Sequence, residues 1–181
     1  MDQDPYSVGN NPDSNDTGFH RASVEGSVRG MQIIAIAMMV GVLSFFGIVL
    51  VTTQGNVFGT QSPELITIIA AGFGILAIVN HVIIPAIIAG AQLKRISTGG
   101  FSELGDAAKV EQICGVYRGQ LIIALALLEG AAFFNLIALM IEHSAVALGA
   151  VILLLGLMIL RFPTRDKVSF WVQDKLRELQ M

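Results

Sequence analysis

A single carboxylate interrupts an otherwise apolar stretch of the sequence, and it is the residue most able to carry chemistry. Glu129 lies within the run 119–141, which contains no other acidic or basic residue. A carboxylate near the bilayer centre costs roughly 2.5–3.5 kcal/mol, so such a group is normally protonated, paired or facing a polar cavity. This placement favours reversible binding of a proton or another cation. The alternative is a hydrogen bond to a neighbouring helix that serves packing alone.

Two polar residues of the preceding apolar run fall at a similar depth. At 1.5 Å per helical residue, Glu129 lies about 15 Å and His81 about 16 Å inside the basic ends of their runs. Asn80 is adjacent to His81, and Pro85 lacks the N–H that would reach the His81 carbonyl oxygen. A carboxyl, an imidazole, an amide and a free carbonyl therefore share one depth. The sequence does not show whether they face each other, and a membrane histidine serves as often in packing as in proton relay.

Long apolar helices are needed to position these residues. About 20 residues at 1.5 Å each cross the hydrocarbon core, and four runs have roughly this length and composition. They cover residues 31–53, 65–92, 119–141 and 145–160. The second run follows Ser62-Pro63-Glu64, a sequence typical of a helix start with serine as the cap. We predict an all-α, polytopic membrane protein with a four-transmembrane-helix bundle.

The composition agrees with a membrane protein. The chain has 181 residues, of which 54% are hydrophobic and 14% charged. Its mean hydropathy of +0.69 is far above what one soluble core needs. A net charge of -3 predicts no nucleic-acid surface, and the single cysteine, Cys114, excludes a disulfide framework. The expected partner is the lipid bilayer.

The basic residues predict the orientation. All 11 lysines and arginines precede the first run, lie between the second and third, or follow the fourth. The two opposite loops, 54–63 and 142–144, contain none. Cytoplasmic loops carry the excess of Lys and Arg, so both termini and the central loop should lie in the cytoplasm. We predict an integral, multi-pass protein.

The segments that flank the transmembrane domain, 30–162, differ in character. Residues 1–29 are rich in Asp, Asn, Ser and Gly, which predicts a disordered cytoplasmic tail and no cleaved signal peptide. Residues 163–181 place apolar side chains on one helical face, which predicts a cytoplasmic amphipathic helix on the membrane surface or on the central loop. Helical spacing in 106–117 predicts that the third helix begins outside the membrane.

Small residues recur at four-residue intervals in every apolar run. Such ridges let helix backbones approach closely, within one bundle or between copies. They are compatible with a homo-oligomer or a larger membrane complex. The pairs are Ala37 and Gly41, Ala70 and Gly74, Ala86 and Gly90, Ala126 and Gly130, and Ala145 and Gly149.

The common enzyme motifs are missing from the sequence. It has no Walker loop, no G-x-S-x-G, no H-E-x-x-H and no Cys/His zinc spacing. His20 and His143 have no partners at ligand spacing. We therefore predict no catalytic residue, no metal site and no cofactor. The protein is not expected to be an enzyme, and at most it is a non-catalytic part of an ion-translocating complex.

Part of the chain resembles the proteolipid c subunit of rotary ATP synthases. The string RGQLIIALALLEGAAFFNLIALMIE, residues 118–142, is similar to the second helix of that family, where an Arg-led cytoplasmic start precedes an apolar helix with one essential carboxylate. The string IPAIIAGAQLKRI, residues 84–96, is similar to the end of the first helix. The resemblance covers residues 65–141 and implies that Glu129 is the reversible proton site.

Three functions remain open from the sequence. The first is a small integral membrane protein that binds or translocates protons through Glu129, as the c-subunit resemblance implies. The second is a structural or assembly component of a membrane complex, in which Glu129 forms an interhelical hydrogen bond. The third is a small proton-coupled carrier, in which one membrane carboxylate serves substrate and proton alternately.

Overall fold

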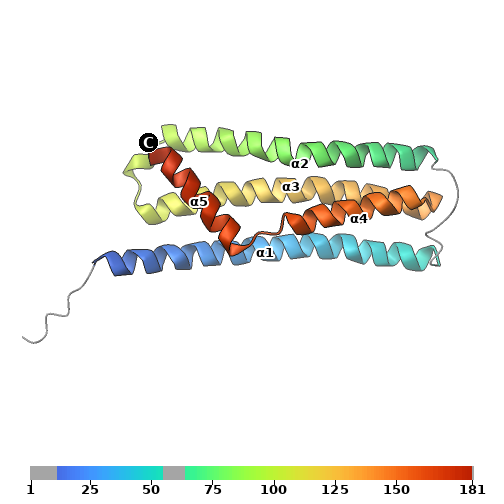
Figure 1. Cartoon of the computed structure of the whole chain (residues 1–181), viewed down its shortest axis with the longest axis horizontal. Helices are drawn as coiled ribbons and strands as arrows, with labels where there is room; N and C mark the ends of the chain where they lie inside the picture. Colours follow the sequence, from blue (N-terminus) through green and yellow to red (C-terminus); the bar gives the residue numbers. More distant parts are fainter. Residues whose placement is uncertain (1–11, 55–63, 181) are drawn as a thin grey trace, which may run out of the picture.

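The computed structural model describes residues 12–54 and 64–180, and this part of the chain is almost entirely helical (Figure 1). It contains five α-helices and one 3₁₀ helix, with no strand among the described residues. The all-α prediction is therefore confirmed. The helices are α1 (Pro12–Thr52), α2 (Leu65–Thr98), η1 (Phe101–Glu103), α3 (Asp106–Glu142), α4 (Ala145–Leu160) and α5 (Arg165–Gln180).

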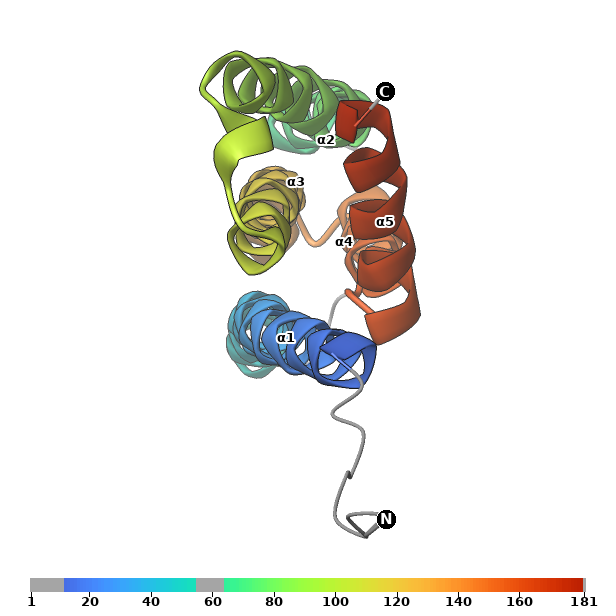
Figure 2. The same cartoon turned by 90° about the vertical axis from the view of Figure 1, so that its left-hand side faces the viewer.

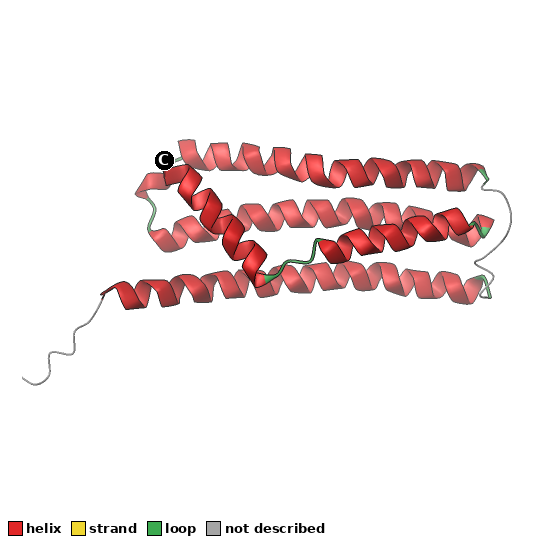
Figure 3. Cartoon of the chain, viewed as in Figure 1, coloured by secondary structure: helices red, strands yellow, loops and turns green. Residues whose placement is uncertain are grey.

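The helix α3 is the centre of the molecule. Figure 2 shows α3 between α1 and α2, with α4 and α5 together on one face of this layer. Successive helices from α1 to α4 alternate in direction, so α1 and α3 run parallel (Figure 1). α3 contacts each of the other four α-helices, and α5 crosses it obliquely. The described connections are short (Figure 3).

Three helices are long and apolar enough to cross a membrane: α1 from Glu25 onward, α2 and α3. The helix α4 is shorter, about 24 Å at 1.5 Å per residue against a hydrocarbon core of about 30 Å. It reaches the required length only together with α5, from which it is bent by 63°. Large apolar side chains cover the outside, such as Val51 at 80% and Leu160 at 71% exposed. A surface of this kind suits lipid rather than water.

A seven-residue repeat places α1 against α3. Val28, Ala35, Val42 and Val49 are buried, while most of their neighbours on α1 are exposed. An apolar repeat of this period forms a narrow seam along a partner helix, because it keeps the same face toward the partner turn after turn. Phe45 continues the seam and packs edge to face on the α3 ring of Phe133, with centroids 5.5 Å apart.

Small side chains line the face of α2 that meets α3. Thr67, Ala70, Gly74 and Ala77 are buried there. The Asn135 side-chain nitrogen on α3 donates to the Ala70 carbonyl oxygen at 3.0 Å. A methyl group at position 74 would lie 3.3 Å from the same nitrogen. Because the side chains are small, the amide can reach the backbone of the neighbouring helix.

The predicted small-residue pairs have different surroundings in the structure. Gly41 and Gly74 lie where a side chain of α3 comes close to their helix. Gly90, Gly130 and Gly149 have no other atom within 4 Å of where a Cβ would lie. Only the first two therefore act as close-approach points within the described part of one chain.

The N-terminal boundary differs from the prediction of a disordered tail over 1–29. Residues 1–11 lie outside the described residues, and α1 begins at Pro12 and continues without a break into the apolar segment. Residues 12–29 therefore form one helix with the apolar segment that follows them. Extending an existing helix also needs no new nucleus, which is the costly step of helix formation.

The C-terminal helix α5 packs onto the bundle. Val168 and Val172 are buried against it, whereas Phe170 on another face is 76% exposed. This agrees with the amphipathic pattern predicted for 163–181. The corner before α5 is tied to α1, because the Gln32 amide donates to the Pro163 carbonyl oxygen at 3.1 Å.

The N-terminus of α2 is capped by another helix. The predicted cap, Ser62, lies outside the described residues, and Glu64 at the N-cap position makes no side-chain cap bond. Instead, the carboxylate of Glu142, the last residue of α3, accepts hydrogen bonds from the N–H groups of Ile66 and Thr67, each at 2.8 Å. It satisfies two of the free N–H groups at this end of α2 and meets the positive end of the helix dipole.

Removal of this cap should destabilise the fold. Glu142→Ala leaves two N–H groups of α2 without an acceptor, so we expect the melting temperature in detergent micelles, followed by circular dichroism at 222 nm, to fall by several degrees. Glu142→Gln keeps one acceptor, so its melting temperature should lie between those of Glu142→Ala and the wild type. Glu64→Ala is the matched control, because its side chain caps nothing. Equal melting temperatures for Glu142→Ala and Glu64→Ala would contradict the tertiary cap.

Candidate functional site

Glu129 lies where α3 contacts α1, opposite Gly41. A methyl group at position 41 would lie 3.3 Å from Glu129 Oε1 and 3.9 Å from Phe133 Cζ. A contact of 3.3 Å is tighter than most contacts of a Cβ, so a side chain at position 41 would require the carboxylate to shift by a few tenths of an ångström. The parallel packing of α1 and α3 thus brings a glycine and a carboxylate together at the seam.

The carboxylate lies at the edge of this seam. Glu129 is half-buried, between the buried Leu128 and the exposed Gly130. Phe133 lies one turn further along α3, near the same glycine of α1. Among the side chains that the structure describes, none makes a hydrogen bond or an ion pair with Glu129. The site is therefore a carboxylate in apolar surroundings without a fixed polar partner.

His81 lies on a different interface. It is 6% exposed, on the face of α2 that also carries Ala77 and Gly74, and Gly74 approaches side chains of α3 and α4. Its Nδ1 lies 2.5 Å from the Ile78 carbonyl oxygen of the same helix. A carbonyl oxygen only accepts, so Nδ1 carries the hydrogen of this bond. The imidazole is thus tied to its own backbone.

The predicted equality of depth holds to within about one turn. The contacts of Asn135 with Ala70 and of Glu142 with Ile66 set the antiparallel register of α2 and α3. Counting along both helices from these contacts puts Glu129 level with about residues 76–79, close to His81. The two groups nevertheless face different neighbours, because Glu129 points to α1. No hydrogen bond joins them within the described part of the chain.

The supporting residues of the prediction remain apart from the carboxylate. Asn80 is half-buried and makes no hydrogen bond among the described residues. Pro85 is buried inside α2, which continues to Thr98. The structure therefore does not assemble the polar group of carboxyl, imidazole, amide and carbonyl. What it brings together is Glu129, Gly41 and Phe133.

Two further polar residues hold α2 to α3, and the sequence analysis did not single them out. Asn135 is fully buried and donates to Ala70 and to Ala131 of its own helix, at 3.0 and 2.9 Å. Glu142 is the tertiary cap of α2, although the sequence analysis assigned it to a loop. Asn135 could have been identified from the sequence, because its side-chain amide lies inside an apolar run. Glu142 gave no such signal, because its partners lie in another helix.

No group of three or more His, Cys, Asp or Glu side chains in the described part of the chain could hold a metal ion. The comparisons with known proteins also add no relative: no family model, no curated protein and no solved structure matches this chain.

A methyl group on α1 should displace the carboxylate. Gly41→Ala places a Cβ 3.3 Å from Oε1, so we expect the side chain of Glu129 to rotate toward the exposed face of α3. The rate at which a hydrophobic carbodiimide labels Glu129, measured by mass spectrometry, should change several-fold. Gly47→Ala is the control on the same helix, because position 47 has open space. Equal rates in both variants would contradict the contact between Gly41 and Glu129.

Proposed function

We propose that this chain is a multi-pass membrane protein in which Glu129 binds and releases protons. The observation that carries the proposal is the position of this carboxylate, half-buried among apolar side chains with no polar partner among the described residues. An ionised carboxylate in hydrocarbon is unstable unless paired or hydrated. Taking up a proton removes that charge, so the site favours the protonated form in apolar surroundings and releases the proton when water reaches it.

The space around Glu129 allows its carboxylate to move between a protonated position in apolar surroundings and a position where it releases the proton. Gly41 leaves room for the carboxylate inside the seam, and Gly130 on the exposed side has open space as well. A rotation about the side-chain bonds is enough to move the carboxylate between the two, with no shift of the helix backbone. Such a side chain is neutral in apolar surroundings and releases its proton only where water reaches it.

The structural alternative receives less support for this residue. In that alternative, Glu129 serves as an interhelical hydrogen bonder. Asn135 and Glu142 already provide polar bonds between α2 and α3, with distances of 2.8–3.0 Å. No hydrogen bond joins Glu129 to α1 among the described residues. A carrier for a second substrate is not favoured by any contact at this site.

The proposal includes four membrane crossings with both termini in the cytoplasm. α1, α2 and α3 supply three crossings, and the short helix α4 supplies the fourth, with α5 on the cytoplasmic side of the membrane. Because successive helices alternate in direction, the lysine and arginine positions gather at one end of the bundle (Figure 1). The positive-inside rule assigns that end to the cytoplasm. The resemblance of 65–141 to the c subunit points to the proton as the bound ion.

Replacing the carboxylate by an amide tests the proposal. Glu129→Gln should abolish carbodiimide labelling in the membrane and proton uptake by reconstituted vesicles, followed with a pH-sensitive dye, while its helix content stays at the wild-type level. Glu111→Gln, on an exposed position of the same helix, should retain both. The structural alternative predicts instead that Glu129→Gln keeps proton uptake or fails to assemble. Wild-type proton uptake in Glu129→Gln would refute the proposal.

The oligomeric state separates the c-like function from a carrier. A large closed ring in mild detergent, measured by native mass spectrometry, is the expected result for a protein that works like the c subunit. A dimer would favour a carrier and count against the c-like part of the proposal. The proton site at Glu129 is tested separately, by the amide substitution above.

A further inference from the structure

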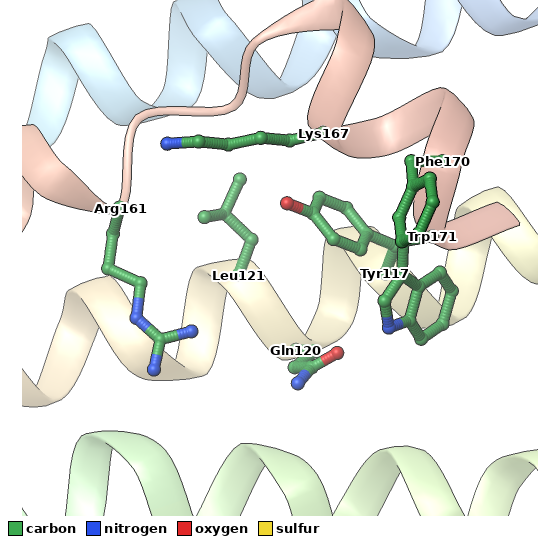
Figure 4. Close-up of a pocket in the computed structure, with 7 residues that line it drawn as sticks. All are labelled: Tyr117, Gln120, Leu121, Arg161, Lys167, Phe170 and Trp171. Atoms are coloured by element: carbon green, nitrogen blue, oxygen red, sulfur yellow. The ribbon is translucent and has the colours of Figure 1, made fainter. Parts of the chain in front are cut away.

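A pocket of about 330 Å³ lies at the basic end of the bundle, where α3, α4 and α5 meet (Figure 4). This volume is at the lower end of the range for small-molecule sites. Arg161 comes from the end of α4, and Lys167 comes from the first turns of α5. Figure 4 shows these two cations on one side of the pocket and aromatic rings on the other. The full lining is Tyr117, Gln120, Leu121, Arg161, Lys167, Phe170 and Trp171.

The two cations are available to an anion. No carboxylate lies within ion-pair distance of Arg161 or Lys167 in the part of the chain that the structure describes. The Lys167 ammonium donates to the Leu160 carbonyl oxygen at 3.2 Å, which uses one of its three hydrogens. By contrast, the nearby Arg165 pairs with Glu25. Two uncompensated cations at one pocket attract a phosphate or carboxylate.

An unpaired acceptor adds to the pocket. Gln120 Oε1 is buried and has no hydrogen-bond partner. This oxygen is closed off from the solvent, so a ligand hydroxyl reaches it only when the Gln120 side chain rotates toward the pocket. The pocket thus combines two cations with an acceptor, which matches a phosphate that is esterified to a polyol such as glycerol.

An exposed apolar surface adjoins the cations. Phe170 lines the pocket and is 76% exposed, and Leu160, next to Arg161, is 71% exposed. Leu160 continues the exposed apolar face of α4, with Ile159 at 62%. A ligand with an anionic head and apolar chains could therefore place its head in the pocket and its chains along α4. A free phosphate would make no use of this surface.

The aromatic residues of the pocket are of the types found at the membrane–water boundary. The only tryptophan of the chain and one of its two tyrosines line the pocket, with ring centroids 5.1 Å apart. Trp and Tyr are enriched at the membrane–water boundary, where lipid headgroups lie. Clustered lysines and arginines just cytoplasmic of a membrane helix recognise anionic lipids. We propose that this pocket binds the headgroup of an anionic glycerophospholipid, through its phosphate and glycerol oxygens.

The single tryptophan provides the readout for a binding test. The full chain in a non-ionic detergent is titrated with short-chain phosphatidylglycerol, short-chain phosphatidylcholine or inorganic phosphate. The emission of Trp171 should change in a saturable way with phosphatidylglycerol and much less with the other two. Retention of radiolabelled phosphatidylglycerol is measured in parallel, so that an unresponsive fluorophore does not hide binding. Equal binding of inorganic phosphate, or no retained lipid, would overturn the proposal.

Charge-neutralising variants test the residues. Arg161→Gln and Lys167→Gln should each weaken phosphatidylglycerol binding about fivefold, the effect expected for one basic residue near an anionic membrane surface. Arg165→Gln and Lys175→Gln are matched controls, because these cations already pair with Glu25 and Glu178. Equal losses in the controls would show attraction by net charge alone and refute the pocket. Carbodiimide labelling of Glu129 should remain at the wild-type rate in all four variants, which separates this proposal from the proton site.

Discussion

Hydrocarbon offers no hydrogen bonds, so every polar group placed in it must find a partner within the protein or lose its charge. The three polar side chains of α3 from Glu129 to Glu142 meet this constraint in different ways. Asn135 and Glu142 find backbone partners on α2, at 2.8–3.0 Å. Glu129 faces a glycine of α1 and has no partner in the described part of the chain. The first two join α2 to α3, and the third is the group to which we assign the proposed proton site.

The central position of α3 follows from the same constraint. A helix in contact with all its neighbours can carry polar side chains that would be unstable on a helix surrounded by lipid. α3 accordingly has the largest buried share of the three long membrane-type helices. α1 meets it through a narrow seam of valines and alanine, and most of its other apolar side chains lie on the outside of the bundle. α1 contributes apolar packing and one glycine, and so the seam provides space for the carboxylate but no hydrogen bond.

The sequence predicted the existence of the helices well, and their rotation poorly. Long apolar runs reveal a membrane-type helix by length, and α2, α3 and α4 begin where the sequence predicted, with α3 starting at Asp106. The rotation of each helix could not be predicted, because the exposed Leu43 is as apolar as the buried Val42. In a soluble helix, polar residues would mark the outer face. For this reason His81 and Glu129 could be given the same depth, while their different interfaces could not be foreseen.

Features that depend on contacts between distant segments were also beyond the sequence. The cap of α2 by Glu142 joins residues 75 and 76 positions apart, so local capping patterns do not reveal it. The pocket around Arg161 and Lys167 needs the 63° bend between α4 and α5, which brings both cations beside α3. The amphipathic pattern of α5 was visible, but the surface that covers its apolar face was not. The local sequence pattern predicted the helices, whereas the cap and the pocket depend on the packing of helices that are distant in the sequence.

The helix α3 connects the two proposed sites. Gln120 in the pocket and Glu129 in the seam are about 14 Å apart along α3, at 1.5 Å per residue. An anionic headgroup held at Gln120 would add negative charge at the cytoplasmic end of this path. Negative surface potential concentrates protons as it does other cations, within about one Debye length of roughly 8 Å. The two sites are farther apart than this length, so a headgroup held in the pocket leaves the protonation of Glu129 unchanged, and the proton site and the pocket act independently although one helix carries residues of both.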